Sequence, residues 1–443
     1  MAEHVTPVVD LLQQMIRNRC VNDGSEQSGQ ESRNADLLES VLVTGGLDIE
    51  RMRAVSGRDS LIARIEGSDP DAPTLMLMGH TDVVPADPSS WRHDPFGGEI
   101  HDGMVWGRGA IDMYNSTASM AIAVKELVQE GWRPRGTLIY LGVADEEAGG
   151  VQGARWLTEN AWDAVTADYV LTEGGGMSVA TPNGRRTLVT VAEKGMYATR
   201  ITIRGTPSHG SRPYDSDNAV VKAAEVVRRL VAYRPTTHIS DSWREYVASM
   251  GYEESLAAQL TDPREIWAGL ERLPQDHARI AHACTHATVS PNVVHGGEKT
   301  NTIAAQAALD VDVRLLPGQT RDDLEELLTA AIGDLRGDVE WEFFNETAPT
   351  QTPASGPLWD ALTTASMKVR ADSVPLPALM TGGTDARFFR ARGAQAYGFG
   401  MFSNRISLSE WQAMFHASDE RVDLESLEMS VAVWKFVARE LLS

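Results

Sequence analysis

The stretch Thr74-Leu-Met-Leu-Met-Gly-His80-Thr-Asp82 decides the fold class, because an uninterrupted apolar run passes directly into polar residues. Short apolar runs of this kind are typical of strands that are covered on both faces of a sheet. Similar runs, with helix-like stretches at 116–129 and 151–160 between them, begin at Ser60, Thr137 and Tyr169. The alternation predicts an α/β domain with a mixed, mostly parallel sheet.

The pattern changes after Glu193-Lys-Gly195. From there the order strand, helix, strand, strand, helix, strand is typical of a small α+β sandwich, although a long polar, Trp-containing stretch after Tyr233 interrupts it. We therefore expect an inserted α+β domain. The predicted boundaries place residues 1–194 and 344–443 in the α/β domain and residues 195–343 in the insertion.

The composition narrows the classes of function. Forty Lys and Arg residues against 62 Asp and Glu residues give a formal net charge of −22, which would repel nucleic acid and anionic membranes. The sequence shows neither a membrane-spanning apolar run nor the pattern of a secretory signal, and we expect a cytoplasmic protein. Its two cysteines, Cys20 and Cys284, cannot build a disulfide framework or a Cys-based zinc site, and we expect both in the core.

Polar residues follow the strand-like runs, at the edge where open α/β sheets build their sites. They are His80 and Asp82, the run Asp145-Glu146-Glu147, and Glu173; Asp112 and His416 are added from other parts of the chain. Singly, each has an ordinary interpretation: His80 in a polar turn, Asp112 as a helix N-cap. Together, two imidazoles and several carboxylates suit a pair of divalent ions bridged by one acid, with a spare glutamate as general base.

These motifs, in this order and spacing, resemble the M20 metallopeptidase family over essentially the whole chain. The resemblance implies two Zn²⁺ ions per chain, with Mn²⁺ or Co²⁺ as alternatives. It makes Asp112 the bridging ligand, with His80 and Glu173 on one ion and Glu147 and His416 on the other. Glu146 becomes the general base, and Asp82 orients His80. It also implies a catalytic α/β domain and a lid domain that forms a homodimer.

The resemblance assigns further residues to the substrate. Within Gly205-Thr-Pro-Ser-His209, it implies that His209 reaches the partner subunit's site and stabilises the oxyanion. Asn301 and Arg314 match positions that bind the substrate carbonyl and carboxylate; the alternative for Arg314 is a cation on the surface of a strand. The glycine-rich turn Gly382-Gly383-Thr384 matches a second carboxylate contact, where backbone N–H groups face an anion.

The implied activity is metal-dependent hydrolysis of an amide or peptide bond by a metal-bridged water. The substrate would be a small molecule bearing a carboxylate: an N-acyl amino acid, a dipeptide or a peptide C-terminus. Tyr114-Asn115 stands where many relatives have Lys-Gly, and the long insertion favours the carboxypeptidase S-like branch. Two alternatives remain open: a different reaction at the same di-metal site, such as aryl amine release, and a catalytically silent relative that binds a ligand.

Overall fold

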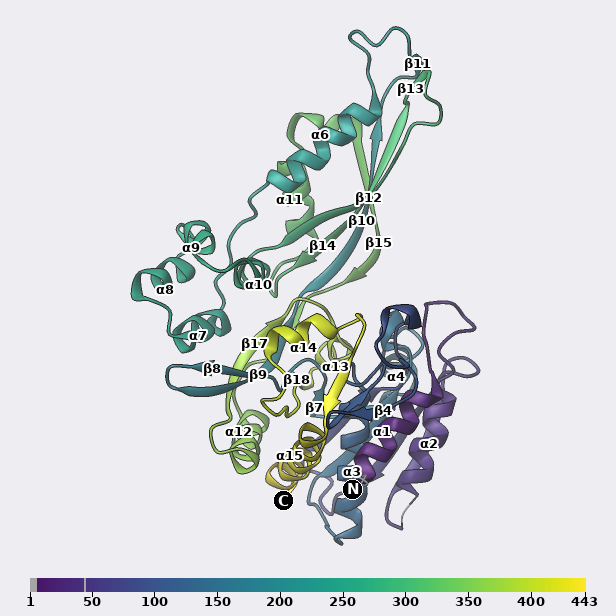
Figure 1. The fold of residues 1–443 in the computed structure, drawn as a ribbon, viewed down its shortest axis with the longest axis vertical. Helices are drawn as coiled ribbons and strands as arrows, with labels where there is room; N and C mark the ends of the chain where they lie inside the picture. The colour runs from purple at the N-terminus through teal and green to yellow at the C-terminus, as the bar shows by residue number, and fades with distance from the viewer. Residues whose placement is uncertain (1–5, 44) are drawn as a thin grey trace. The chain divides into compact units, whose positions relative to one another are not determined.

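The computed structural model describes residues 6–43 and 45–443 (Figure 1). The chain divides into two compact units. The first comprises residues 1–191, 352–378 and 384–443, and the second comprises residues 192–351 and 379–383. The second unit is therefore an insertion with a short additional segment. Its observed limits lie a few residues outside the predicted 195–343.

A ten-stranded mixed sheet organises the first unit, in the order β1-β2-β6-β3-β7-β18-β9-β16, with β8 and β17 also paired to β9. The mixed α/β class is confirmed, and the central strands β6-β3-β7-β18 pair in parallel. Antiparallel pairs flank this centre. Short connections, which can only reverse the chain, join β1 to β2 and β8 to β9, whereas β2 and β6 are far apart in the sequence. The strands are β1 Asp48–Arg53, β2 Asp59–Ile65, β3 Thr74–His80, β6 Thr137–Val143, β7 Tyr169–Thr172, β8 Ser178–Thr181, β9 Gly184–Glu193, β16 Thr350–Gln351, β17 Val374–Met380 and β18 Gln395–Gly398.

Helix α3 packs directly on β3 and also contacts α1, α2 and α15. A Cβ atom at Gly79 would lie 2.4 Å from Oγ1 and 2.9 Å from Cα of Thr117, so the glycine permits this close approach just before His80. The helices of the first unit are α1 Pro7–Asn18, α2 Ser32–Leu42, α3 Tyr114–Gln129, α4 Ala154–Asn160, α5 Trp162–Val165, α12 Pro357–Val369, α13 Ala386–Arg390, α14 Leu408–Met414 and α15 Leu424–Leu442. A small antiparallel sheet in the order β19-β5-β4 completes the unit, from β4 Glu99–His101, β5 Met104–Trp106 and β19 Arg421–Asp423.

The second unit is built on an antiparallel four-stranded sheet, β12-β14-β10-β15. Burial alternates along β10 and β14, and the buried face packs on α6 and α11, which lie on the same side of the sheet (Figure 1). The strands are β10 Gly195–Arg204, β11 Ser208–His209, β12 Thr288–Gly296, β13 Thr302–Ile303, β14 Gln306–Leu315 and β15 Val339–Thr347, and the helices are α6 Ala219–Ala232 and α11 Arg321–Ile332.

Four further helices occupy the polar stretch that the sequence left unassigned. They are α7 Asp241–Met250, α8 Glu254–Thr261, α9 Ile266–Arg272 and α10 Gln275–Thr285. They enclose a small apolar core of their own, centred on Trp243, Leu260 and Ile266. Across the described residues of both units, none of the helices combines the length and apolar character needed to cross a membrane.

Candidate active site

The predicted metal ligands lie at one edge of the first unit's sheet. His80 is the last residue of β3, Glu147 follows β6, and Glu173 follows β7. Because β3 runs parallel to both neighbours, these three strands end at the same edge. Asp112 lies between β5 and α3, and His416 follows α14. The five residues therefore come from five separate connections of one unit.

Asp112 lies between the two histidines. Its Oδ1 is 3.3 Å from Nε2 of His80, and its Oδ2 is 3.3 Å from Nε2 of His416. Each histidine has a glutamate of its own: Nε2 of His416 is 3.2 Å from Oε2 of Glu147, and Nε2 of His80 is 3.8 Å from Oε2 of Glu173. The structure thus brings all five predicted ligands together as two groups that share one carboxylate.

The donor set fits a metal centre. His80, Asp112 and Glu147 offer ligand atoms within 4.8 Å of one another, and so do His80, Glu146 and Glu173. Among the described residues, the buried Oε1 of Glu147 has no hydrogen-bond partner. Buried polar atoms are normally satisfied, and imidazole and carboxylate donors suit borderline divalent ions. Glu146 stands as close to this group as a ligand does.

The pKa values of these side chains are shifted because several carboxyl groups lie close together in a buried place. Burial and then the charge of Asp112 raise the pKa of Glu173 to about 8, and burial and then Glu173 raise the pKa of Glu146 well above its usual range. Burial opposes the ionisation of Asp112, yet His416 and His80 lower its pKa. Hydrogen bonds that its ring donates to Asp112 and Glu147 raise the pKa of His416 to about 10. Bound divalent cations would relieve this repulsion.

Asp82 acts on His80 through its backbone. Nδ1 of His80 is 2.9 Å from the Asp82 carbonyl oxygen and 3.6 Å from its carboxylate. A carbonyl only accepts, so Nδ1 carries a proton, and Nε2, which faces the carboxylates of Asp112 and Glu173, is the nitrogen that a metal ion would take. The carboxylate instead accepts the N–H groups of Glu146 and Glu147, at 3.3 and 3.1 Å. Asp82 therefore positions both the histidine and the loop with the two glutamates.

The side chain of Asp145 does not join the candidate metal ligands, unlike those of the adjacent Glu146 and Glu147. Its Oδ1 accepts from Arg58 at 2.7 Å and from Asn22 at 3.1 Å, and Arg58 also contacts the buried Glu31 at 3.0 Å. Asn22 donates to the Asp82 carboxylate as well, at 2.9 Å. Sequence reasoning found Asp145 only as one of three adjacent acids and missed Asn22, Arg58 and Glu31, which no local pattern marks.

Glu420 is a second residue that sequence reasoning missed. It is fully buried, and its two oxygens accept from the Arg108 guanidinium and from the backbone N–H groups of Gly109, Ile111 and Asp112, at 2.7–2.9 Å. It lies four residues after His416, so one carboxylate ties the Asp112 loop to the His416 segment. The only sequence signal was its place at the end of Met414-Phe-His-Ala-Ser-Asp-Glu.

Asp385 lies next to the predicted glycine-rich turn and is also buried. Neither of its oxygens has a hydrogen-bond partner in the described part of the chain, and burial raises its pKa to about 7. A Cβ atom at Gly150 would lie 2.3 Å from its Oδ1, so a glycine is required there. Its charge adds to the effects that raise the pKa of Glu146.

The predicted substrate residues lie mainly in the second unit. His209 ends β11, and Asn301 directly precedes its partner strand β13; both residues are exposed, and the N–H of Gly210 donates to the Asn301 carbonyl at 2.7 Å. Arg314 is at the far end of β14, paired with Asp312 through two contacts of 2.7 and 3.1 Å. In the turn after β17, Gly382 and Gly383 belong to the second unit, whereas the buried Thr384 belongs to the first.

Comparisons with known proteins agree with this arrangement. The model of peptidase family M20/M25/M40 matches residues 76–440. Aminoacylase-1 of Sus scrofa is 27% identical, over 94% of this chain and 90% of its own. An M20 family metallo-carboxypeptidase from Sulfolobus solfataricus has a TM-score of 0.75 at 18% identity, covering 98% of this chain and 99% of its own. A dinuclear metal binding peptidase of the M20 family from Bacillus subtilis has a TM-score of 0.61 at 15% identity, covering 98% of each chain.

The two solved structures share the fold, and the family match spans most of the chain. The predicted resemblance and fold class are thereby confirmed. The chain therefore belongs to peptidase family M20/M25/M40, and is a hydrolase of amide or peptide bonds in small substrates.

Proposed function

We propose that the chain hydrolyses an amide or peptide bond next to a free carboxylate, using two Zn²⁺ ions. The observation that carries the proposal is Asp112, whose two oxygens each face a different histidine at 3.3 Å. That geometry suits a carboxylate that bridges two ions. His80 and Glu173 would hold one ion, and Glu147 and His416 the other. When bound, such ions polarise the scissile carbonyl and make water more acidic.

Glu146 is the proposed general base. It follows the buried strand β6, adjoins the proposed ligand Glu147, and its backbone N–H is held by the Asp82 carboxylate at 3.3 Å. In the reaction, the Glu146 carboxylate takes a proton from the attacking water and passes it to the leaving amine nitrogen.

His209 is the proposed stabiliser of the oxyanion, acting in the partner subunit of a homodimer. The N–H of Ser211 donates to Nδ1 of His209 at 3.1 Å, so in the neutral ring Nε2 carries the proton and is a donor. His209 is exposed, as a residue that reaches another subunit must be in the isolated chain. An N–H donor placed at the developing negative charge lowers the barrier.

Substrate recognition is proposed to involve Asn301, Arg314 and the turn Gly382-Gly383-Thr384. Arg314 already forms a bidentate pair with Asp312, so a substrate carboxylate would share the guanidinium with it or displace it. N-acyl amino acids are the first substrates to test, since the relative from Sus scrofa is named aminoacylase-1. We also propose a cytoplasmic location, in line with the two free cysteines.

The test combines metal content with turnover. Elemental analysis of the metal-replete protein is expected to give about two ions per chain, and a chelator should abolish cleavage of N-acyl amino acids and dipeptides. Glu146→Gln is expected to keep both ions but to lower kcat by ~10²–10⁴-fold, because the proton acceptor is lost. The matched control is Glu159→Gln, an exposed glutamate on α4.

Three outcomes of these experiments would contradict the proposed function. Wild-type turnover in Glu146→Gln would remove Glu146 from the mechanism. Two bound ions without cleavage of any amide in the panel would favour a different reaction at this site, and aryl amides belong in the panel for that reason. A metal-replete protein that holds no ion would favour the silent, ligand-binding relative.

A further inference from the structure

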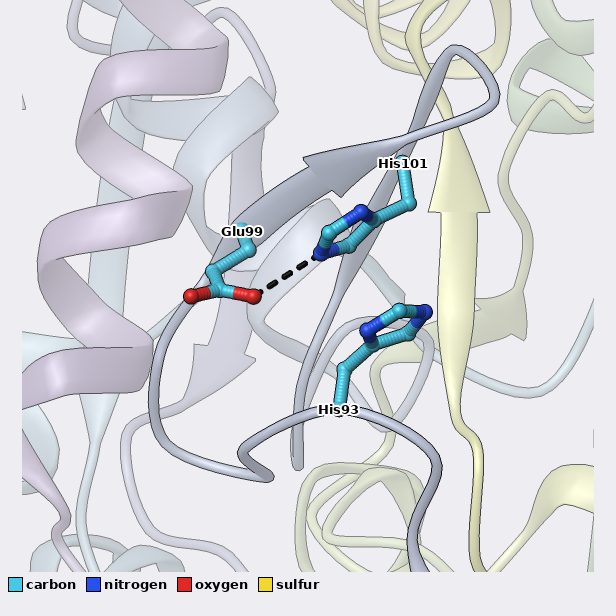
Figure 2. Close-up of side chains that lie close together, drawn as sticks. All are labelled: His93, Glu99 and His101. Carbon is cyan, nitrogen blue, oxygen red and sulfur yellow. Dashed lines mark hydrogen bonds and ion pairs between the residues drawn. The ribbon is translucent and has the colours of Figure 1, made fainter.

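A second group of metal-binding side chains lies in the first unit, apart from the candidate active site. It consists of His93, Glu99 and His101, which Figure 2 shows facing one another. Glu99 and His101 are the first and last residues of β4, so they project from the same face of that strand. His93 comes from the loop before β4 and lies against His101.

The three side chains are already close. Nε2 of His101 is 2.8 Å from Oε2 of Glu99, and the rings of His93 and His101 are stacked, with centroids 3.7 Å apart and planes 10° apart. One ligand atom from each residue lies within 4.8 Å of the others. Trp106 on β5 supports His93 from the side, with ring centroids 4.8 Å apart and planes at 75°. The group is therefore held by packing as well as by a hydrogen bond.

We propose that His93, Glu99 and His101 form a third divalent-metal site with the preference of Zn²⁺. Two imidazoles and one carboxylate suit borderline transition metals, whereas Mg²⁺ and Ca²⁺ favour oxygen donors alone. A tetrahedral zinc ion holds its nitrogen ligands roughly 3.4 Å apart, so the ion would draw the group together. The side chains have room to rotate, since those of Glu99 and His101 are 53% and 37% exposed.

The charges around the group allow a cation. Two guanidiniums, of Arg92 and Arg421, stack on Trp106, and both would repel an ion if they were unpaired. Each has a carboxylate partner, however: Arg92 pairs with Asp419 at 2.7 Å, and Arg421 pairs with Glu410. The formal charge of −22 adds a general attraction for cations.

Three protein ligands leave one position on the ion for water, so the site should exchange metal more readily than a buried centre. The position of the three residues in the chain also indicates how a bound ion would affect the first unit. Trp106 ends β5 and leads into the segment 107–112, which ends at Asp112. An ion at His93 would pin the loop before β4 against this small sheet, and would stabilise the first unit without entering the reaction.

The experiment counts Zn²⁺ ions bound by the whole chain, in competition with a chromophoric chelator. Wild type is expected to bind three equivalents, the third more weakly than the first two. His93→Ala and His101→Ala should each bind two and keep wild-type kcat at zinc concentrations that fill only the tight sites. Glu99→Gln should weaken the third equivalent at least ~10-fold, since it loses a ligand charge. The matched control, His277→Ala, changes an exposed histidine on α10 and should bind three.

A variant that lacks the proposed dinuclear ligands separates this inference from the proposed function. In His80→Ala/His416→Ala, one equivalent should remain, and adding His101→Ala should remove it. Two equivalents in wild type, or a third equivalent that survives His93→Ala and His101→Ala, would overturn the proposal. The group would then be a hydrogen-bonded Glu–His pair with a stacked ring.

Discussion

At the scale of single residues, backbone groups that only accept or only donate determine where two candidate histidines, one in each unit, carry a proton. The Asp82 carbonyl determines which nitrogen of His80 carries the proton, and the N–H of Ser211 does the same for His209. The first choice leaves a lone pair at His80, as a metal ligand needs, and the second leaves a donor at His209, as an oxyanion contact needs. Backbone partners thus favour, in the neutral rings, the opposite tautomers that the proposed roles of these two histidines require.

Glu420 offers a test of positioning. Glu420→Gln replaces a carboxylate that accepts four N–H donors with an amide that has one acceptor oxygen and a repelling NH₂ group. We expect the Asp112 segment to loosen and zinc affinity at the tight sites to fall ~10–100-fold, as for other residues that hold metal ligands in place. Competition with a chromophoric chelator measures the change.

The control for Glu420 is Glu428→Gln, which changes an exposed glutamate on α15 and should leave affinity unchanged. Saturating zinc should restore most of the turnover of Glu420→Gln, since Glu420 does not touch the proposed reacting atoms. Unchanged affinity in a folded Glu420→Gln protein would show that the other contacts of the Asp112 segment are sufficient.

Sequence reasoning found His80, Glu147 and Glu173 because each follows a strand-like run and parallel strands end at one edge. Asp112 and His416 follow no strand of that sheet, and it was the resemblance to the family that assigned them as ligands. Sequence reasoning could not predict the residues behind them. Asn22, Arg58 and Glu31 come from a turn, a hairpin and the start of α2, and only the folded chain places them beside Asp145. Partners that depend on tertiary contact leave no periodic signal.

At the scale of elements, the central strands and α3 agree with the predicted pattern, whereas the segment from α7 to α10 does not. Its helices are only 7 to 11 residues long, and isolated helices of that length are marginal in water. Local signals did exist: Ser240 caps α7 by accepting from the N–H of Trp243. The four helices stabilise one another through their shared core. Sequence analysis that treats each segment separately therefore does not predict them.

The end of α10 provides a pH test. Burial, and then His282, lower the pKa of His286 from 6.5 to about 4. Between pH 4 and 6.5, His286 is protonated in the unfolded chain but neutral in the folded protein. The free energy of unfolding therefore rises with pH in this range, and the contribution of His286 is lost as the pH falls from 6.5 to 4. The loss attributable to His286 should be on the order of 3 kcal/mol. His286→Gln should remove that part of the slope in urea unfolding at several pH values.

The control for this pH test is His277→Gln, an exposed histidine on the same helix, which should keep the wild-type slope. His286 has its own contacts, with Nε2 2.9 Å from Oγ1 of Thr237, so His286→Gln is expected to be less stable at neutral pH. An unaltered slope in the variant would mean that His286 is protonated in the folded protein as readily as in the unfolded chain.

At the scale of the whole molecule, the second unit is an insertion whose ends meet. The N–H of Thr352 donates to the Val191 carbonyl at 2.8 Å, and Glu193 pairs with Thr350 across the antiparallel strands β9 and β16. The core between the β10 sheet and α6 and α11 draws its residues from 197–339 alone. A unit with its own core and adjacent ends can be added or removed without rerouting the rest of the chain.

The whole-molecule prediction follows from those ends. Replacing residues 194–349 with Asn-Gly would join Glu193 to Thr350 by a two-residue turn that antiparallel strands accept. The shortened protein should unfold cooperatively and still bind about two tight zinc ions, because all five proposed ligands and Glu146 lie in the first unit. Its turnover should fall at least ~10²-fold, since His209, Asn301 and Arg314 are gone. Zinc titration measures the retained metal binding, and a kinetic assay measures the loss of turnover. A folded protein without tight zinc would place essential ligands in the removed segment, and wild-type turnover would show that the second unit takes no part in the reaction.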